Sequence, residues 1–339
     1  MKFVDRKHEQ ERLTRLLSGD VPAFAIIRGR RRVGKSTLIK RILKEADVYF
    51  EADRTDKETQ MSNLSYVLSH TFPGFNDAQY KDWRALLTAL NHRVTAKITL
   101  CLDEFPYLVE SDSSLPSVIQ NLLDSEELKY NIILCGSSQT MMYNLTHEQS
   151  SPLYGRKEAD FNIRPIKLPF LQEALGLTAE ETIENYAVWG GIPRYWRLRE
   201  SSASLMDSVN EHIMSTMGAL YEEPQSLFQD DFKVIVKTST IMTIVGGGAN
   251  RLKEIAGRCN EPATNLSRPL AKLIDLGYLE KDIPFGVSAK DTKKSLYRIA
   301  DPFLFFHYKF VPANRSFIEL GRTALINGIL ESRLPELTG

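Results

Sequence analysis

The sequence predicts an α/β protein, in which a parallel sheet covered by helices is followed by a helical segment and a winged helix-turn-helix domain. Short apolar runs alternate with helical patterns over residues 1–169, and residues 170–231 are mostly helical in pattern. Residues 232–312 combine helical patterns with two strand-like runs, and we expect residues 313–339 to form a helix. Strands that alternate with helices favour a parallel sheet, because parallel neighbours need a long crossover connection.

Five apolar runs predict the strands of this sheet. Each run is short, as expected for a buried parallel strand. Between the runs, apolar residues recur with helical spacing, for example at Leu38, Ile39 and Ile42. The expected strands span residues 21–29, 47–52, 97–105, 131–138 and 160–168.

The segment 170–231 carries two local signals for helix starts. Thr178 followed by Glu181 fits a capping box, and Pro193 fits the first turn of another helix. We therefore expect a helical lid after the α/β core.

The third segment has the element order of a winged helix-turn-helix: three helices, then two strands joined by a lysine-bearing loop. Its first helix is expected to end at the glycines of residues 246–248. Pro269 would interrupt the interior of the third helix, so we expect that helix to begin near Ser267 or to be kinked. From about residue 316 to residue 339 we expect one continuous helix.

The charge and residue composition restrict the kinds of partner and environment that we expect for this chain. The chain has 43 basic and 43 acidic residues in 339, so it has no overall field that would hold it on DNA or on an anionic membrane. Cys101 and Cys135 fall within strand-like runs, and with Cys259 we expect them to be reduced packing residues. No stretch is long and apolar enough for a membrane span. We expect a soluble cytoplasmic protein.

A phosphate-binding pattern lies between the first strand and the first core helix. Gly29, Gly34, Lys35 and Ser36 satisfy G-x-x-x-x-G-K-[ST], in which backbone N–H groups surround the phosphates, the lysine reaches them as a charge and the serine hydroxyl holds Mg²⁺. Three arginines within the loop exceed what phosphate binding needs; they could face solvent, pair with acidic lid residues or contact a partner. The expected nucleotide-binding residues are Gly29, Arg30, Arg31, Arg32, Val33, Gly34, Lys35, Ser36 and Thr37.

Two carboxylates follow the strand of residues 97–105, at the sheet edge where open α/β proteins place their chemistry. We assign Asp103, with Ser36, to Mg²⁺, and Glu104 to the attacking water as general base. Taken alone, the pair could also be a solvated acidic turn.

Two later positions are further catalytic candidates. Ser137 and Ser138 end the strand of residues 131–138, where a hydroxyl could contact the γ-phosphate or the water, although serines at such a position also simply turn the chain. Arg156 could stabilise charge in the transition state, from its own chain or across a subunit interface, or could be an ordinary surface arginine.

Taken together, the motifs resemble the archaeal-type ATPase family, a branch of the STAND and AAA+ relatives within the P-loop NTPases. The matching stretches are "FVDRKHEQERL" with Arg6, "GRRRVGKS", "CLDEFPYL", "LCGSS", "LYGRK" and "WGGIPRYW". The resemblance implies ATP as the nucleotide, Arg156 as an arginine finger or sensor, and Arg6 and Pro193 as further nucleotide-site residues. It also implies that Gly191 and Pro193 position the lid.

Family members commonly continue into a nuclease-like domain. We expect residues 313–339 to be only the approach to such a domain, so no nuclease activity is carried over.

The winged segment has a modest basic excess, with ten Lys and Arg against six Asp and Glu between residues 250 and 300. In the usual docking of such domains, Asn265, Arg268 and Lys272 on the third helix would face the major groove of duplex DNA. Wing lysines at positions 290, 293 and 294 (Lys290, Lys293 and Lys294) would contact phosphates. Winged helices also serve as protein-binding modules, and this alternative stays open.

The sequence thus predicts an ATP-binding, ATP-hydrolysing switch whose nucleotide state is coupled to the winged domain, with DNA, a protein partner or further copies of the chain as its partners. One alternative is a DNA-bound factor of the replication-initiator type with slow hydrolysis. Another is a scaffold that holds ATP without hydrolysing it.

Overall fold

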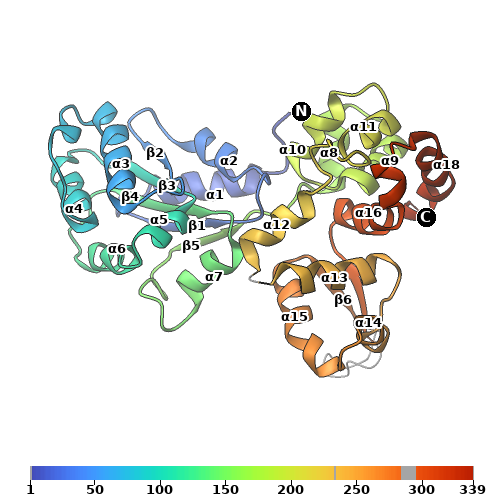
Figure 1. Cartoon of the computed structure of the whole chain (residues 1–339). Helices are drawn as coiled ribbons and strands as arrows, with labels where there is room; N and C mark the ends of the chain where they lie inside the picture. The colour runs from blue at the N-terminus through green and yellow to red at the C-terminus, as the bar shows by residue number, and fades with distance from the viewer. Residues whose placement is uncertain (1, 233, 284–294, 339) are drawn as a thin grey trace. The chain divides into compact units, whose positions relative to one another are not determined.

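The computed structural model describes residues 2–232, 234–283 and 295–338, and its contacts divide the chain into two compact units (Figure 1). The N-terminal unit consists of residues 5–164. The C-terminal unit consists of the described residues within 1–4 and 165–339. The chain therefore passes between the units twice, after residue 4 and after residue 164. The proposed boundaries at residues 231 and 312, inside the C-terminal unit, remain predictions.

The N-terminal unit is built on a parallel sheet of five strands in the order β2-β3-β4-β1-β5. All five predicted strands are present, each shorter than its apolar run, and the prediction that they are parallel is confirmed. β4 lies between β1, which leads into the phosphate loop, and β3, which carries Asp103. The strands are β1 (Phe24–Arg28), β2 (Val48–Glu51), β3 (Thr99–Asp103), β4 (Asn131–Gly136) and β5 (Ala159–Asn162).

One face of this sheet carries the main apolar core. Alternate strand residues, among them Ile26, Phe50, Leu100 and Leu134, are buried together with apolar side chains of the covering helices. Strand side chains alternate between faces, so these positions share one side of the sheet. The helices that contribute to this core are α3 (Lys57–Thr71), α4 (Trp83–Arg93), α5 (Phe105–Ser111), α6 (Leu115–Asp124) and α7 (Gln139–His147), with the short 3₁₀ helix η1 (Phe75–Asp77).

The opposite face is covered by α1 (Lys7–Leu17) and α2 (Lys35–Ile42). The guanidinium of Arg12 on α1 lies 5.7 Å from the ring centre of Phe161 on β5. The ammonium of Lys40 on α2 lies 4.2 Å from the ring centre of Tyr49 on β2. Helices on both faces complete the α/β architecture that the sequence predicts.

The C-terminal unit begins with helices, as predicted for the lid segment. Thr178 and Glu181 form the predicted capping box, and Pro193 is the first residue of its helix. These helices are α8 (Leu168–Leu175), α9 (Ala179–Trp189), α10 (Pro193–Glu200), α11 (Leu205–His212) and α12 (Glu223–Asp231).

Three helices and a two-stranded antiparallel sheet follow, in the order expected of a winged helix-turn-helix. They are α13 (Ile235–Gly246), α14 (Leu252–Cys259), α15 (Ala263–Asp275), β6 (Leu279–Asp282) and β7 (Leu296–Ile299). The winged-helix assignment stays a prediction, and the wing positions Lys290, Lys293 and Lys294 lie outside the described residues.

The predicted late start of the third helix is wrong. α15 begins at Ala263 and continues through Pro269. Its apolar side, Leu266, Leu270 and Leu273, is almost completely buried. Burying each leucine stabilises by roughly 1.5–3 kcal/mol, which together exceeds the cost of about 3 kcal/mol for an interior proline.

The chain ends in several short helices rather than the single helix expected from residue 316 onward. α17 stops at Glu319, and Gly321 then adopts a φ of +64°. This left-handed conformation is available to glycine at little cost and does not continue a right-handed helix. The elements after β7 are α16 (Pro302–Phe310), η3 (Pro312–Asn314), α17 (Arg315–Glu319), α18 (Thr323–Arg333) and η4 (Leu334–Leu337).

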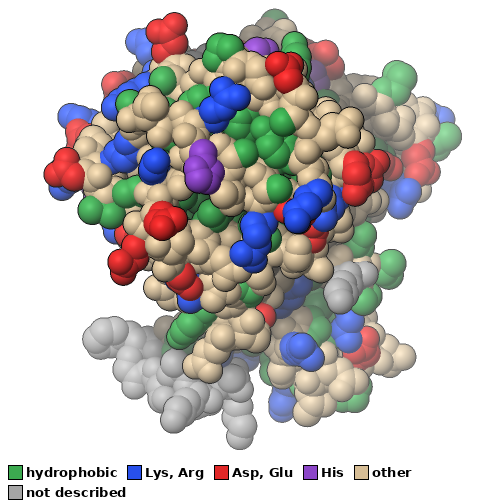
Figure 2. Space-filling model, turned by 90° about the vertical axis from the view of Figure 1, so that its left-hand side faces the viewer, with side chains coloured by type: hydrophobic (Ala, Val, Ile, Leu, Met, Phe, Trp, Pro, Cys, Tyr) green, Lys and Arg blue, Asp and Glu red, His purple; other side chains and the backbone are tan. Residues whose placement is uncertain are grey.

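One face of the molecule shows the mixture of charges expected from the neutral composition (Figure 2). Figure 2 shows the side of the molecule on which α3, α4 and α6 lie, where lysine and arginine side chains are interspersed with aspartate and glutamate. No helix of the described residues has the length and apolar character needed to cross a membrane. Cys101 and Cys135 are buried and free, as predicted for packing residues.

Leu100→Ala should destabilise the N-terminal unit by about 2–5 kcal/mol, because the burial of the side chain is lost and a cavity remains. Leu100 on β3 is 0% exposed, whereas Val21, the matched control, is 75% exposed. Val21→Ala should change the free energy of unfolding by about 0.5 kcal/mol or less. Urea denaturation followed by circular dichroism measures both; equal shifts would contradict the placement of Leu100 in the core.

Candidate nucleotide-binding site

Three chain segments converge at one edge of the N-terminal sheet. Gly29 follows β1, Asp103 ends β3, and Ser137 follows β4. Because these strands are parallel, their carboxyl ends lie at the same edge. The predicted loop, metal and water residues therefore lie near one another, although they are far apart in the sequence.

The backbone of the loop requires glycine at its first position. Gly29 has a φ of +153°, and a Cβ placed on it would lie 2.3 Å from the carbonyl oxygen of Ile163. Any other residue would collide with that backbone. Gly34 directly precedes α2, so the first N–H groups of this helix face the loop and form a site for an anion.

Lys35 is buried and folds back over the loop. Its Nζ donates to the carbonyl oxygens of Gly29 at 2.9 Å and Arg30 at 3.2 Å. Arg31 and Arg32 are exposed, whereas Arg30 is 6% exposed, and the roles of all three arginines remain predictions. Val33 in the loop is buried, and Thr37 in the first turn of α2 is exposed.

The predicted metal pair is brought together. Ser36 Oγ donates to Asp103 Oδ2 at 2.7 Å across 67 positions of sequence. Asp103 is 1% exposed. Burial pushes the pKa of Asp103 upward, but hydrogen bonds from Cys135, Tyr49 and Ser36 outweigh it and hold the pKa below its ordinary value. Asp103 is therefore a charged carboxylate at neutral pH.

This donor set fits Mg²⁺. A hydroxyl and one ionised carboxylate are the oxygen ligands that Mg²⁺ takes in nucleotide sites, where water and phosphates supply the rest of its shell. Among the described residues, no group of three or more His, Cys, Asp and Glu could hold a metal ion. A site made by Ser36, Asp103 and phosphate is consistent with that finding.

Tyr49 and Cys135 match no motif, yet both donate to Asp103. The Tyr49 hydroxyl donates to Oδ2, the same oxygen that Ser36 contacts. Tyr49 belongs to β2, whose Glu51 is in register with Asp103. Only the strand order shows that β2 and β4 flank β3, so local sequence signals could not identify these donors.

Glu104 is held in a defined orientation. Its Oε2 accepts hydrogen bonds from Ser137 N at 3.1 Å and Ser137 Oγ at 2.9 Å. Its backbone is left-handed, with φ 50° and ψ 43°, a conformation that non-glycine residues seldom adopt outside functional sites. Of the two candidate serines, Ser137 contacts Glu104, whereas Ser138 caps α7 by accepting from Met141 N at 3.4 Å.

Over residues 3–197 the sequence matches the family described as an ATPase domain predominantly from Archaea. This chain belongs to that family. The predicted resemblance is therefore confirmed, on a match that covers both the loop and the Asp103 strand.

One sequence relative and two solved structures are similar to nearly the whole chain. An uncharacterized protein of Methanocaldococcus jannaschii, MJECL04, is 29% identical over 323 residues, which are 94% of this chain and 71% of that protein. The Walker-type ATPase paby2304 of Pyrococcus abyssi has a TM-score of 0.69 at 20% identity, covering 91% of this chain and 96% of that one. The ORC2 protein of Aeropyrum pernix, solved as ADPNP-ADP complexes, has a TM-score of 0.60 at 14% identity, covering 95% and 96%. These likenesses show the P-loop NTPase fold.

Arg156, the later arginine of the predicted site, lies in a surface ion pair. Arg156 Nε lies 2.7 Å from Asp124 Oδ1, and its Nη2 lies 2.9 Å from Oδ2. Arg156 Nη1 also donates to the carbonyl oxygen of Pro152 at 2.9 Å. Arg156 is thus held at the surface by a bidentate ion pair and by a backbone carbonyl. The finger or sensor role of Arg156 remains a prediction.

The two residues assigned to the nucleotide by the family resemblance have different surroundings. Arg6 is 5% exposed. Its Nη2 donates to the carbonyl oxygens of Arg164 at 2.5 Å and Val33 at 3.5 Å, and Nη1 donates to Asp5 O at 2.9 Å. The observed contacts make Arg6 a support of the loop backbone. Pro193 begins α10 in the C-terminal unit, and its part in nucleotide binding remains a prediction.

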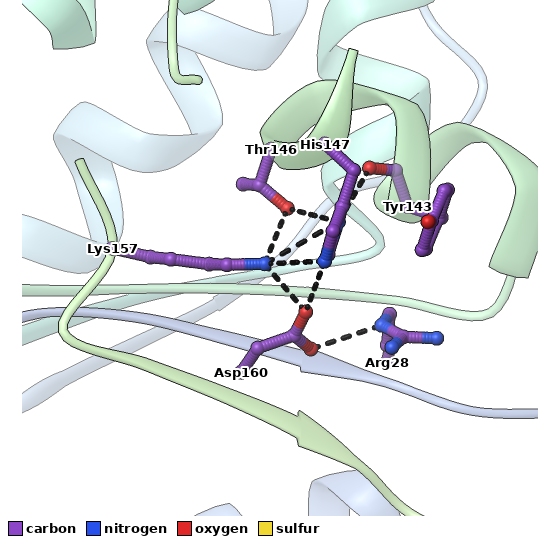
Figure 3. Close-up of polar contacts among 6 residues, drawn as sticks. All are labelled: Arg28, Tyr143, Thr146, His147, Lys157 and Asp160. Atoms are coloured by element: carbon purple, nitrogen blue, oxygen red, sulfur yellow. Dashed lines mark hydrogen bonds and ion pairs between the residues drawn. The ribbon is translucent and has the colours of Figure 1, made fainter. Parts of the chain in front are cut away.

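A polar cluster on the α7 side of the sheet anchors the strand that leads into the loop (Figure 3). Asp160 on β5 accepts from Arg28 Nε at 2.9 Å and from Lys157 Nζ at 2.7 Å. Burial pushes the pKa of Asp160 upward, but the hydrogen bond from Lys157 and the charge of Arg28 hold it below its ordinary value. Arg28 is the last residue of β1, so the cluster fixes the strand end directly before Gly29. The cluster consists of Arg28, Tyr143, Thr146, His147, Lys157 and Asp160.

Arg6→Met should destabilise the N-terminal unit by about 1–3 kcal/mol, because the carbonyl oxygens of Val33 and Arg164 lose a charged donor in a buried position. Hydrogen exchange at the loop amides should become faster in the same variant. Arg15→Met, which changes an exposed arginine on α1, is the control. If Arg6→Met instead lowered ATP affinity and left the nucleotide-free stability unchanged, Arg6 would be a direct nucleotide ligand.

Proposed function

We propose that this chain is a Mg²⁺-dependent, ATP-hydrolysing switch whose nucleotide state controls its C-terminal unit. The observation that carries the proposal is the convergence of Ser36, Asp103, Glu104 and Ser137 beside the phosphate loop. The family membership supports ATP as the nucleotide. An orienting partner for Glu104 favours hydrolysis over mere retention of the nucleotide.

Each side chain has a separate task in this proposal. Lys35 turns from the loop carbonyls to the β- and γ-phosphates, and the N-terminus of α2 binds the same anion through its N–H groups. Ser36 and Asp103 hold Mg²⁺, which neutralises phosphate charge when bound. Since Ser137 holds Oε2 of Glu104, Oε1 is the atom we assign to accept a proton from the attacking water.

We assign the response to nucleotide binding and hydrolysis to the C-terminal unit. Pro193 and the helices that follow β5 act as the lid, and α15 acts as the recognition helix for duplex DNA. Asn265 and Arg268 are exposed on α15 and available for such contact. Lys272 was expected to face outward as well, but its Nζ donates to Asp231 O and lies 4.6 Å from the ring centre of Phe232. Lys272 is therefore a packing residue rather than a DNA contact.

Arg156 is assigned to transition-state charge, which it reaches by leaving Asp124. In an assembly of several copies, Arg156 could act on the nucleotide bound by a neighbouring chain. In a single chain, Arg156 could act only on the nucleotide bound by the same chain.

Glu104→Gln should lower kcat for ATP hydrolysis by about 10²–10⁴-fold, because the amide cannot accept the proton of the water. ATP affinity should be retained, since Gln keeps the hydrogen bond from Ser137. Steady-state phosphate release, measured with and without duplex DNA, and equilibrium ATP binding check both statements.

Glu51→Gln is the matched control, since Glu51 is an exposed carboxylate at the end of the neighbouring strand. Stimulation of the wild type by DNA would support the DNA-coupled switch. A wild type that hydrolyses ATP no faster than Glu104→Gln under either condition would leave only the scaffold that holds ATP.

Arg268→Ala should weaken binding of the full chain to duplex DNA by about tenfold, because one exposed cation on α15 is lost. If that cation contacts a phosphate, the slope of log affinity against log salt concentration should fall by about one. Arg15→Ala in the N-terminal unit is the control and should bind as the wild type does. A wild type without salt-sensitive DNA binding would instead favour a protein as the partner of this unit.

A further inference from the structure

Tyr49 is placed at the proposed Mg²⁺ site by its strand. β2 pairs in parallel with β3, with Tyr49 in register with Cys101 and Glu51 in register with Asp103. Its side chain therefore lies on the sheet face that α2 covers, beside the carboxylate that ends β3. The hydroxyl of Tyr49 donates to Asp103 Oδ2, to which Ser36 Oγ also donates.

The ring of Tyr49 is fixed from a second side. The ammonium of Lys40, on the helix that begins with Lys35 and Ser36, lies 4.2 Å from the ring centre. A cation over an aromatic face is attracted by the ring and stabilises this orientation. The phenol is thus held between α2 and β3, the two elements that supply the expected magnesium residues.

The donors on Asp103 are not equivalent. We assign the hydroxyl oxygen of Ser36 to Mg²⁺. Ser36 can then donate its proton to Asp103 only if its hydroxyl keeps the orientation that binding of the ion requires. The thiol of Cys135 is a weak donor. The backbone N–H of Glu104 donates to Oδ1, at 2.9 Å. Tyr49 is therefore the strong side-chain donor on Oδ2 that does not also have to hold the ion.

The phenol hydroxyl of Tyr49 donates to a carboxylate that is only 1% exposed. A protonated phenol next to a buried carboxylate compensates the lost hydration of that charge.

We propose that Tyr49 is a positioning residue of the magnesium site, whose hydroxyl orients Asp103 and thereby strengthens binding of the Mg²⁺-nucleotide complex. This inference rests on the proposed Mg²⁺-dependent function. Hydrogen-bond partners of metal ligands commonly change metal affinity by about 10–100-fold when they are removed. Tyr49 acts through Asp103 and has no assigned contact with the nucleotide.

The test compares nucleotide affinity of the full chain with and without Mg²⁺. Isothermal titration calorimetry with ADPNP, in buffer containing either Mg²⁺ or EDTA, gives the enhancement of affinity by the ion. Tyr49→Phe keeps the ring and its contact with Lys40 and removes only the hydroxyl. We expect it to lower the enhancement about tenfold and to leave affinity in EDTA unchanged.

Tyr130→Phe is the matched control. Tyr130 is a buried tyrosine of the same unit, and its hydroxyl donates to Leu87 O at 3.3 Å. This variant loses the same group without touching Asp103, so both affinities should equal those of the wild type. Thermal denaturation of all three proteins shows whether Tyr49→Phe remains folded.

The outcomes separate the two proposals. A wild type that does not bind ADPNP, or binds it equally with Mg²⁺ and EDTA, contradicts the proposed function. A wild type with normal enhancement and a Tyr49→Phe variant that retains all of it overturns the role of Tyr49 alone. Equal losses with Mg²⁺ and with EDTA in Tyr49→Phe also overturn it, because they indicate a structural role rather than a role at the ion.

Discussion

A carboxylate removed from water remains charged only if hydrogen bonds replace its hydration, and Asp103 satisfies this condition at the centre of the N-terminal unit. Its donors come from α2, from β2, from β4 and from the backbone that follows β3. The phosphate loop precedes α2, so its position depends on the same carboxylate. Loss of the charge at Asp103 would therefore disturb the loop and the two neighbouring strands, β2 and β4, besides the metal site.

The strand order explains why the water-activating part of the site lies beside the metal part. β4 is inserted between β1 and β3, so the segment that follows β4 meets the segment that follows β3. Ser137 can then donate to Glu104 with both its N–H and its hydroxyl. The left-handed backbone of Glu104 is tolerated because β3 ends directly before it and α5 begins directly after it, which fixes the chain on both sides.

Most of the fold and half of the site could be predicted from local patterns. The five strands follow from apolar runs, and Ser36 and Asp103 follow from motifs at the carboxyl ends of predicted parallel strands. The contact of Tyr49 with Asp103 and that of Ser137 with Glu104 depend on strand order and register, which no local signal contains. α15 illustrates the opposite error: Pro269 is a strong local signal against a helix, but the buried leucines of that helix outweigh it.

Arg6 connects the loop to both ends of the N-terminal unit. One guanidinium nitrogen donates to Val33 O in the loop and to Arg164 O at the last residue of the N-terminal unit. The other crossing of the chain, after Val4, lies two residues before Arg6. In the proposed switch, a shift of Val33 on nucleotide binding would change the geometry of a side chain that also contacts both ends of the unit. A buried guanidinium loses stability when an acceptor moves away, so we expect the loop and the backbone at residues 5 and 164 to move together.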